Sequence, residues 1–116
     1  MRIETEVTSK GALIIQLHGR MQLNDLQGME DRFRALIKGY RGVIVDLSCL
    51  DVLFSMGLRA LILCAQLLEL KGGKLALMAP SENVMAVLRA SGASQLIPIC
   101  RDLEEAESVV VLSTIT

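Results

Sequence analysis

The most informative stretch of the chain is Asp46-Leu47-Ser48-Cys49-Leu50-Asp51-Val52-Leu53-Phe54-Ser55-Met56-Gly57. It follows Gly42-Val43-Ile44-Val45, an apolar run rich in β-branched residues that is typical of a central strand covered on both faces. It precedes residues 58–71, which contain neither Gly nor Pro until the helix would end and could form about four helical turns. The stretch therefore predicts a buried strand, a turn and a helix start, with Ser55 at the mouth of that helix.

The segments before this stretch predict a hairpin and a helix. Residues 3–7 and 12–17 are strand-like and are joined around Lys10 and Gly11, as in a β-hairpin. We expect Asn24 to cap a helix over residues 25–38 that is stopped by Gly39. Its apolar side chains recur at helical spacing and are expected in the core: Leu26, Met29, Phe33, Leu36 and Ile37.

The segments after it complete an alternating pattern of strands and helices. Gly72-Gly73 ends the long helix, and residues 74–78 form a strand. Ser81 opens a short helix that runs to residue 90, residues 96–100 form a final strand, and Asp102 caps a last helix. Such alternation favours a mostly parallel sheet with right-handed crossovers. The expected fold class is α/β: a single domain of residues 1–116 in the order β-β-α-β-α-β-α-β-α, with an N-terminal antiparallel hairpin and four helices.

Composition limits the classes of function that fit the chain. Its 116 residues, 52% of them hydrophobic, can form one sizeable core. With a net charge of −1, no basic cluster and no Trp, the chain is not expected to bind nucleic acid. No apolar run approaches the roughly 18 residues of a membrane span, and residues 1–6 do not resemble a signal peptide. We therefore expect a cytoplasmic protein without direct membrane insertion.

Residues suited to catalysis or metal binding are sparse. The chain has three widely spaced cysteines among apolar residues, Cys49, Cys64 and Cys100. This setting favours reduced core thiols over disulfides or a metal site. The one histidine, His18, is expected to be partly buried and hydrogen-bonded, and the Ser55–His18–Asp46 triad that can be written lacks a Gly-x-Ser-x-Gly elbow. We expect no enzymatic activity, no cofactor and no metal.

The helix after the turn has an apolar face and a mixed face. The first is expected to enter the core, with Leu58, Leu61, Cys64, Ala65 and Leu68. On the other face, Ile62 and Leu63 lie among or beside polar residues. They either contact a partner or are scattered apolar residues of an ordinary surface.

The turn resembles a motif of STAS domains, the family of anti-sigma factor antagonists. In that family Asp-Leu-Ser leads into Asp-Ser-Ser/Thr-Gly-Leu, whose first serine is phosphorylated by an anti-sigma kinase. Asp46-Leu47-Ser48 and Gly57-Leu58 match this pattern, which puts Ser55 at the phosphoacceptor position. Weaker similarity in the apolar pattern extends over almost the whole chain. The resemblance implies a STAS-like fold.

Two positions depart from the family motif. Phe54 replaces the aspartate before the serine, and Met56 replaces the hydroxyl residue after it. Arg20 lies where the family commonly carries acidic residues, and it should be near Ser55 because loops at the carboxyl ends of parallel strands share one edge. Either Arg20 pairs with phosphoserine 55, or Ser55 is not a kinase substrate and Phe54 and Met56 form a constitutive docking knob.

Residue type alone leaves two roles for Ser55. It could be a helix N-cap worth about 1 kcal/mol. It could instead accept a phosphate, which the helix dipole would tolerate and whose charge of about −1.5 to −2 a partner packed on the turn would have to desolvate. The motif around Ser55 favours the second role.

The resemblance implies a protein-binding module switched by phosphorylation. Unphosphorylated, it would bind an anti-sigma factor serine kinase and release a sigma factor or equivalent target, and a PP2C-type phosphatase would reset it. The expected partner-binding residues are Arg20, Phe54, Met56, Gly57, Leu58, Arg59, Ile62 and Leu63. The alternative is a STAS scaffold that does not depend on phosphorylation, such as a stressosome component or a subunit of a transporter complex. A weak homodimer stays open.

Overall fold

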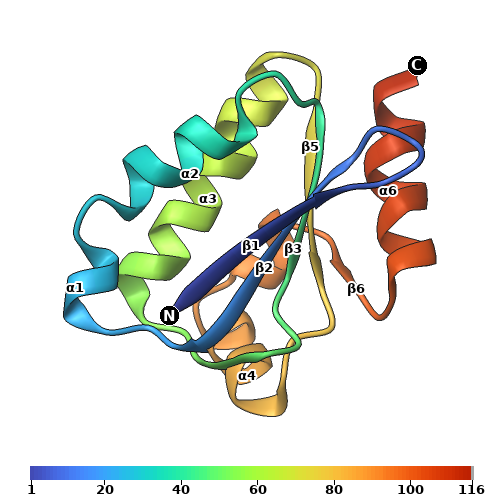
Figure 1. Cartoon of the computed structure of the whole chain (residues 1–116). Helices are drawn as coiled ribbons and strands as arrows, with labels where there is room; N and C mark the ends of the chain where they lie inside the picture. The colour runs from blue at the N-terminus through green and yellow to red at the C-terminus, as the bar shows by residue number, and fades with distance from the viewer. Residues whose placement is uncertain (116) are drawn as a thin grey trace.

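The computed structural model describes the backbone of residues 1–115 and the side chains of residues 1–111. It contains a six-stranded mixed sheet with helices on both faces (Figure 1). In chain order the elements are β1 (Arg2–Val7), β2 (Leu13–Arg20), α1 (Leu23–Leu26), α2 (Met29–Ile37), β3 (Gly42–Asp46), β4 (Leu50–Val52), α3 (Ser55–Leu70), β5 (Lys74–Met78), α4 (Glu82–Ala90), α5 (Ala93–Leu96), β6 (Ile99–Cys100) and α6 (Leu103–Ile115).

The sheet has the order β1-β2-β3-β5-β6, and β4 pairs with the end of β2. The hairpin is antiparallel, with Arg2 opposite His18 and Val7 opposite Leu13. The pairs β2–β3, β3–β5 and β5–β6 are parallel. The expected N-terminal hairpin and the mostly parallel sheet are confirmed, and the carboxyl ends of β2, β3 and β5 share one edge.

Alternate strand residues enter two separate cores, as the period of two in a strand requires. Leu13 and Ile15 of β2 pack in the larger core, which is covered by α2, α3 and α4. Ile14 and Ile44 point to the opposite face and pack with Ala106 and Val110 of α6. Figure 1 shows α2 and α3 on one side of the sheet and α6 on the other. The helix stripes behave as expected: Phe33 of α2 and Leu61 of α3 are fully buried.

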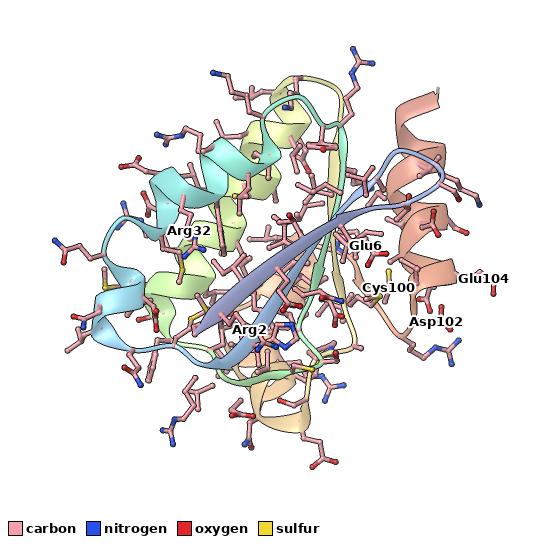
Figure 2. The ribbon with its side chains drawn as sticks, viewed as in Figure 1. Arg2, Glu6, Arg32, Cys100, Asp102 and Glu104 are labelled. Atoms are coloured by element: carbon pink, nitrogen blue, oxygen red, sulfur yellow. The ribbon has the colours of Figure 1, made fainter. Side chains whose placement is uncertain are left out.

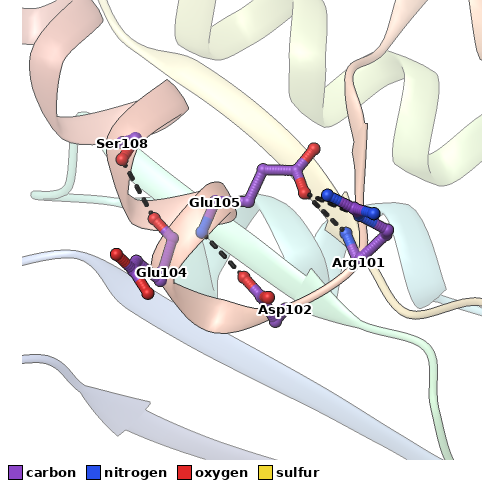
Figure 3. A network of polar contacts seen from close by, with 5 residues as sticks. All are labelled: Arg101, Asp102, Glu104, Glu105 and Ser108. Carbon is purple, nitrogen blue, oxygen red and sulfur yellow. Dashed lines mark hydrogen bonds and ion pairs between the residues drawn. The ribbon is translucent and has the colours of Figure 1, made fainter.

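The start of α6 is fixed by the cap that the sequence predicted. Asp102 Oδ1 accepts a hydrogen bond of 2.9 Å from the Glu105 backbone N–H (Figure 3). Arg101 Nε lies 3.4 Å from Glu105 Oε2, and the Ser108 hydroxyl donates to the Glu104 carbonyl at 3.0 Å. Figure 2 shows Asp102 and Glu104 at the start of α6, with Cys100 nearby.

The single helix expected over residues 25–38 is wrong, because the structure divides this segment into α1 and α2. Gly28 separates the two helices in a left-handed conformation, with φ of 76°. Asn24 does not cap a helix, since it lies inside α1. The cap position belongs to Gln22, whose backbone N–H donates a 2.8 Å hydrogen bond to Asp25 Oδ2.

Two further elements differ from expectation in the second half of the chain. The final strand is only Ile99–Cys100, because Ala93–Leu96 form the short helix α5. The strand β4, with Leu50 opposite Gly19, was not predicted. The cap of α4 is as expected, since Ser81 Oγ accepts from the Val84 N–H at 3.2 Å.

Within the part of the chain that the structure describes, no helix combines the length and apolar character needed to cross a membrane.

Candidate functional site

The loop after β2 and the turn before α3 meet at the carboxyl edge of the sheet, as expected. The Gly19 backbone N–H donates to the Cys49 carbonyl at 2.8 Å, and Arg20 lies opposite Val52 in the β2–β4 pair. Met21, which is 2% exposed, packs against Gly57 in the first turn of α3. The unpredicted β4 strand therefore ties the two segments together and places Ser55 beside the end of β2.

Ser55 is the first residue of α3, so the expectation that it could be the N-cap is wrong. Phe54 is at the cap position with an extended backbone, and its side chain cannot supply the capping hydrogen bond. Its carbonyl accepts the first helical hydrogen bond, from Leu58 N–H at 2.9 Å. Ser55 is exposed, and among the described residues its hydroxyl has no hydrogen-bond partner. The hydroxyl is thus accessible to another protein that could modify it.

Two large apolar side chains that are exposed to solvent come directly before and after Ser55. Phe54 is 42% exposed and Met56 is 57% exposed. Single exposed apolar residues are ordinary, but here two of them directly precede and follow an exposed serine. Two exposed arginines come from the neighbouring segments, Arg20 at the end of β2 and Arg59 one turn along α3. We call this set of residues the Ser55 surface: Arg20, Phe54, Ser55, Met56 and Arg59.

The other residues expected to bind a partner are less exposed than the Ser55 surface. Gly57 is buried, and Leu58 is 6% exposed and packs in the larger core. The expectation that Leu58 contacts a partner is corrected, because its side chain faces the sheet. Ile62 and Leu63 are half-buried, and Ile62 packs against the larger core. Gly57 and Leu58 therefore lie beneath the Ser55 surface, and Ile62 and Leu63 border it.

The two arginines of the Ser55 surface differ in their partners. Arg59 Nε lies 3.4 Å from Glu30 Oε1, an exposed ion pair that links α3 to the first turn of α2. In the described part of the chain, Arg20 forms no ion pair. Glu30 was not anticipated from the sequence, because it comes close to the site only when α2 packs on α3.

A hollow lies beside the Ser55 surface. It has a volume of about 350 Å³ and is bounded by the start of α2 on one side and by α3 on the other. Its lining residues are Leu26, Gly28, Met29, Glu30, Asp31, Met56 and Arg59. Arg59 and Glu30 both line this hollow, so a movement of Arg59 away from Glu30 would change its lining.

No catalytic triad is assembled from the residues that the structure describes. His18 is partly buried, as expected, but its Nε2 lies 3.4 Å from Glu4 Oε2 in an arrangement that is not a hydrogen bond. The expectation that His18 is hydrogen-bonded is therefore wrong for this nitrogen. Asp46 uses Oδ1 to accept from the Ser48 N–H at 3.0 Å. Neither side chain orients the Ser55 hydroxyl.

The cysteines fall into two environments. Cys64 and Cys100 are buried, whereas Cys49 is exposed in the β3–β4 turn, so the core assignment was wrong for Cys49. Burial raises the pKa of Cys64 from 9.0 to about 11. Burial, followed by the charges of Glu105 and Asp102, also raises the pKa of Cys100. Across residues 1–111, no group of His, Cys, Asp and Glu side chains is arranged to hold a metal ion.

Comparisons with known proteins agree on one family. A family model for the STAS domain matches residues 2–106. BtrV of Bordetella bronchiseptica, which is assigned as an anti-sigma factor antagonist, is 33% identical over 97 residues that cover 83% of this chain and 84% of BtrV.

Solved structures with a similar fold include further proteins of this kind. A Thermotoga maritima protein assigned as an anti-sigma factor antagonist has a TM-score of 0.83 at 19% identity and covers 93% of both chains. The anti-sigma factor antagonist SpoIIAA in its unphosphorylated form has a TM-score of 0.78 at 19% identity, over 93% of this chain and 96% of that chain. The phosphorylated form of SpoIIAA from Bacillus has a TM-score of 0.71 at 18% identity, over 93% and 99%. At such identities the likeness establishes the fold.

Proposed function

The chain belongs to the STAS domain family, and on this basis we propose that it is an anti-sigma factor antagonist whose partner binding is switched by phosphorylation of Ser55. The observation that carries the proposal is the free, exposed hydroxyl of Ser55 at the start of α3 between Phe54 and Met56. The module binds and does no chemistry itself. Its partner is an anti-sigma factor serine kinase, and the outcome of binding is release of a sigma factor or an equivalent target.

The covalent step takes place in the complex with that kinase. A bond forms between Ser55 Oγ and the γ-phosphorus of ATP held by the kinase, and the bond from that phosphorus to the ADP oxygen breaks. ADP leaves, and the hydroxyl proton passes to a base of the kinase. Because no neighbouring side chain in residues 1–111 binds the hydroxyl, the kinase meets no competing hydrogen bond.

The phosphate weakens binding because of where it sits. It adds a charge of about −1.5 to −2 between two apolar side chains that a partner would cover. Closing the interface over it would require the binding protein to desolvate this charge. A PP2C-type phosphatase then restores the hydroxyl and the affinity.

A second candidate is a STAS scaffold that binds its partner without any phosphorylation. The exposed apolar side chains at Phe54 and Met56 favour it, because they replace polar residues of the family motif and enlarge the apolar patch. Such a scaffold would use the same Ser55 surface constitutively.

A binding experiment separates the two candidates. The full chain is prepared with Ser55 and, by genetic-code expansion, with phosphoserine at position 55, and both forms serve as baits for proteins of the source cells. A serine kinase among the captured proteins is then purified and assayed for affinity and for ATP-dependent transfer, with Ser55→Ala as the matched control.

The switch predicts that this kinase binds the unphosphorylated form at least about tenfold more tightly, or about 1.4 kcal/mol. It also predicts transfer of phosphate to the parent and none to Ser55→Ala. Equal affinity for both forms, or transfer to another residue, would contradict the switch and favour the scaffold.

A further inference from the structure

Ser55 and Arg59 are four residues apart in α3. Residues at this spacing lie on the same face of a helix, with their Cβ atoms about 5–6 Å apart. Arg59 is the longer of the two and its side chain is 82% exposed, so it is free to turn along the helix toward position 55. Its present partner is Glu30 of α2, at 3.4 Å.

We propose that Arg59 is the internal partner of phosphoserine 55, and that phosphorylation moves Arg59 from Glu30 to the phosphate. This inference rests on the proposed phosphorylation of Ser55 and adds its mechanism. The exchange converts a local charge at the start of α3 into a change in the contact between α2 and α3.

The charges of the two acceptors favour the exchange. Glu30 offers one negative charge from another helix, whereas the phosphate carries about −1.5 to −2 and three acceptor oxygens on the same helix. A guanidinium binds phosphate through two parallel N–H groups, and such charge-assisted pairs are stronger than a single exposed contact. The exposed pair of Arg59 with Glu30 contributes little by itself and is readily broken.

The exchange alters the hollow beside the Ser55 surface. Arg59 and Glu30 bound it together with Met29 and Met56. Once Arg59 has moved, Glu30 faces the hollow without its cation, whereas Asp31 keeps its exposed ion pair with Arg34. Phosphorylation therefore changes the shape and charge of the partner surface beyond the phosphate itself.

Arg20 is the competing candidate for this role. It is exposed, lies at the end of β2 opposite Val52, and within the described residues has no acidic partner to give up. Arg20 precedes the turn on a different element, and a contact with it would leave the α2–α3 link intact. The two arginines thus predict different outcomes in one experiment.

The test uses the full chain with phosphoserine installed at position 55 by genetic-code expansion, so no kinase is required. The second ionisation of the phosphate is followed by ³¹P NMR as a function of pH, in the parent and in Arg59→Gln, Arg20→Gln and Glu30→Gln. Methionine methyl resonances report on the hollow through Met29 and Met56. The charged groups of the Ser55 surface and of the hollow are Arg20, Glu30, Asp31 and Arg59, with Arg34 paired to Asp31, and the variants remove Arg20, Glu30 and Arg59 in turn.

A cation beside the phosphate favours its dianion and lowers its second pKa. We expect the acid dissociation constant to be about threefold larger in the parent than in Arg59→Gln, unchanged in Arg20→Gln, and larger still in Glu30→Gln, where Arg59 has no competitor. The Met29 methyl resonance should shift on phosphorylation in the parent and stay in place in Arg59→Gln.

An equal acid dissociation constant of the phosphate in the parent and in Arg59→Gln would overturn the proposal. A change of this constant in Arg20→Gln alone would overturn it as well. Neither result depends on whether a cell phosphorylates Ser55, because the phosphoserine is introduced directly. The proposed function is tested separately, by the binding and transfer assays with the kinase.

Discussion

Met21 occupies the space that a side chain at position 57 would need. An ideal Cβ built on Gly57 would lie 2.5 Å from Met21 Sδ and 2.8 Å from Met21 Cε. A side chain at position 57 would therefore require Met21 to move, and glycine lets Met21 pack directly on the first turn of α3. The contact joins the loop after β2 to the helix that presents Ser55, so it holds the Ser55 surface in place.

The Gly57–Met21 contact predicts that Gly57→Ala changes the free energy of unfolding in opposite directions in the parent and in Met21→Ala. In the parent, Gly57→Ala should destabilise by about 1 kcal/mol, because overpacking outweighs the helix propensity of alanine. In a Met21→Ala background, which itself loses about 2–5 kcal/mol, the same substitution should stabilise by about 0.5–1 kcal/mol. Urea unfolding of the four proteins measures both effects. The same sign in both backgrounds would show that Met21 does not set the requirement for glycine.

Two serines near helix starts should respond differently to alanine. Ser81→Ala should cost about 1 kcal/mol, because Ser81 Oγ caps α4 through the Val84 N–H. Ser55→Ala should change the free energy of unfolding by less than about 0.5 kcal/mol, since Phe54 holds the cap position of α3. Thermal and urea unfolding give both values. A loss of unfolding free energy for Ser55→Ala as large as that for Ser81→Ala would indicate that Ser55 caps α3, which would contradict the structure.

The apolar part of the Ser55 surface should contribute to partner affinity and not to folding. Phe54→Ala and Met56→Ala should each weaken binding to the captured kinase by about 1–2 kcal/mol, roughly five- to thirtyfold. Leu70→Ala is the matched control, because Leu70 is 84% exposed at the opposite end of the same helix. Titration calorimetry measures all three. Equal losses in the control would show that the interface does not centre on Ser55.

The cysteines should differ in their reaction with an alkylating reagent. In the folded protein at pH 8, Cys49 should react readily, whereas Cys64 and Cys100 should be protected by burial. In denaturant all three cysteines of the chain should react. Mass spectrometry of the labelled peptides identifies the sites, and rapid labelling of Cys64 in the folded state would contradict its placement in the core.

The raised pKa of Cys64 predicts a loss of stability in alkali. Above pH 9.0 the unfolded chain gives up the Cys64 proton, while the folded chain retains it until about pH 11. The contribution of this thiol is complete below pH 9.0 and is lost as the pH rises toward 11, since the folded state then binds more protons than the unfolded state. Between these values the free energy of unfolding should fall more steeply in the parent than in Cys64→Ala. Parallel curves would contradict the burial of Cys64.

The parts of the fold that could be predicted are those encoded by short, regular patterns. The apolar run of β3 and the uninterrupted helix α3 were predicted because each signal lies within one segment. Strand β4 has only 3 residues, and its pairing with β2 depends on a partner far away in the sequence. Gly28 was hidden inside an apolar pattern that continues at helical spacing through α1 and α2.

The candidate site also divides into features that local sequence predicted and features that depend on tertiary packing. The motif located Ser55, and the departures at Phe54 and Met56 identified the exposed apolar patch. The contact of Met21 with Gly57 and the pair of Arg59 with Glu30 could not be predicted, because each joins elements that meet only after folding. Local sequence therefore indicated where the site lies, and tertiary packing determines which side chains it can use.

The most direct test is intact-mass analysis with site mapping of the protein isolated from its own cells, in exponential growth and under stress, with phosphatases inhibited. The switch predicts a species heavier by one phosphate on Ser55, whose fraction changes between the two conditions. Absence of phosphate on Ser55 in both conditions would contradict the switch and leave a constitutive scaffold that binds through Phe54 and Met56.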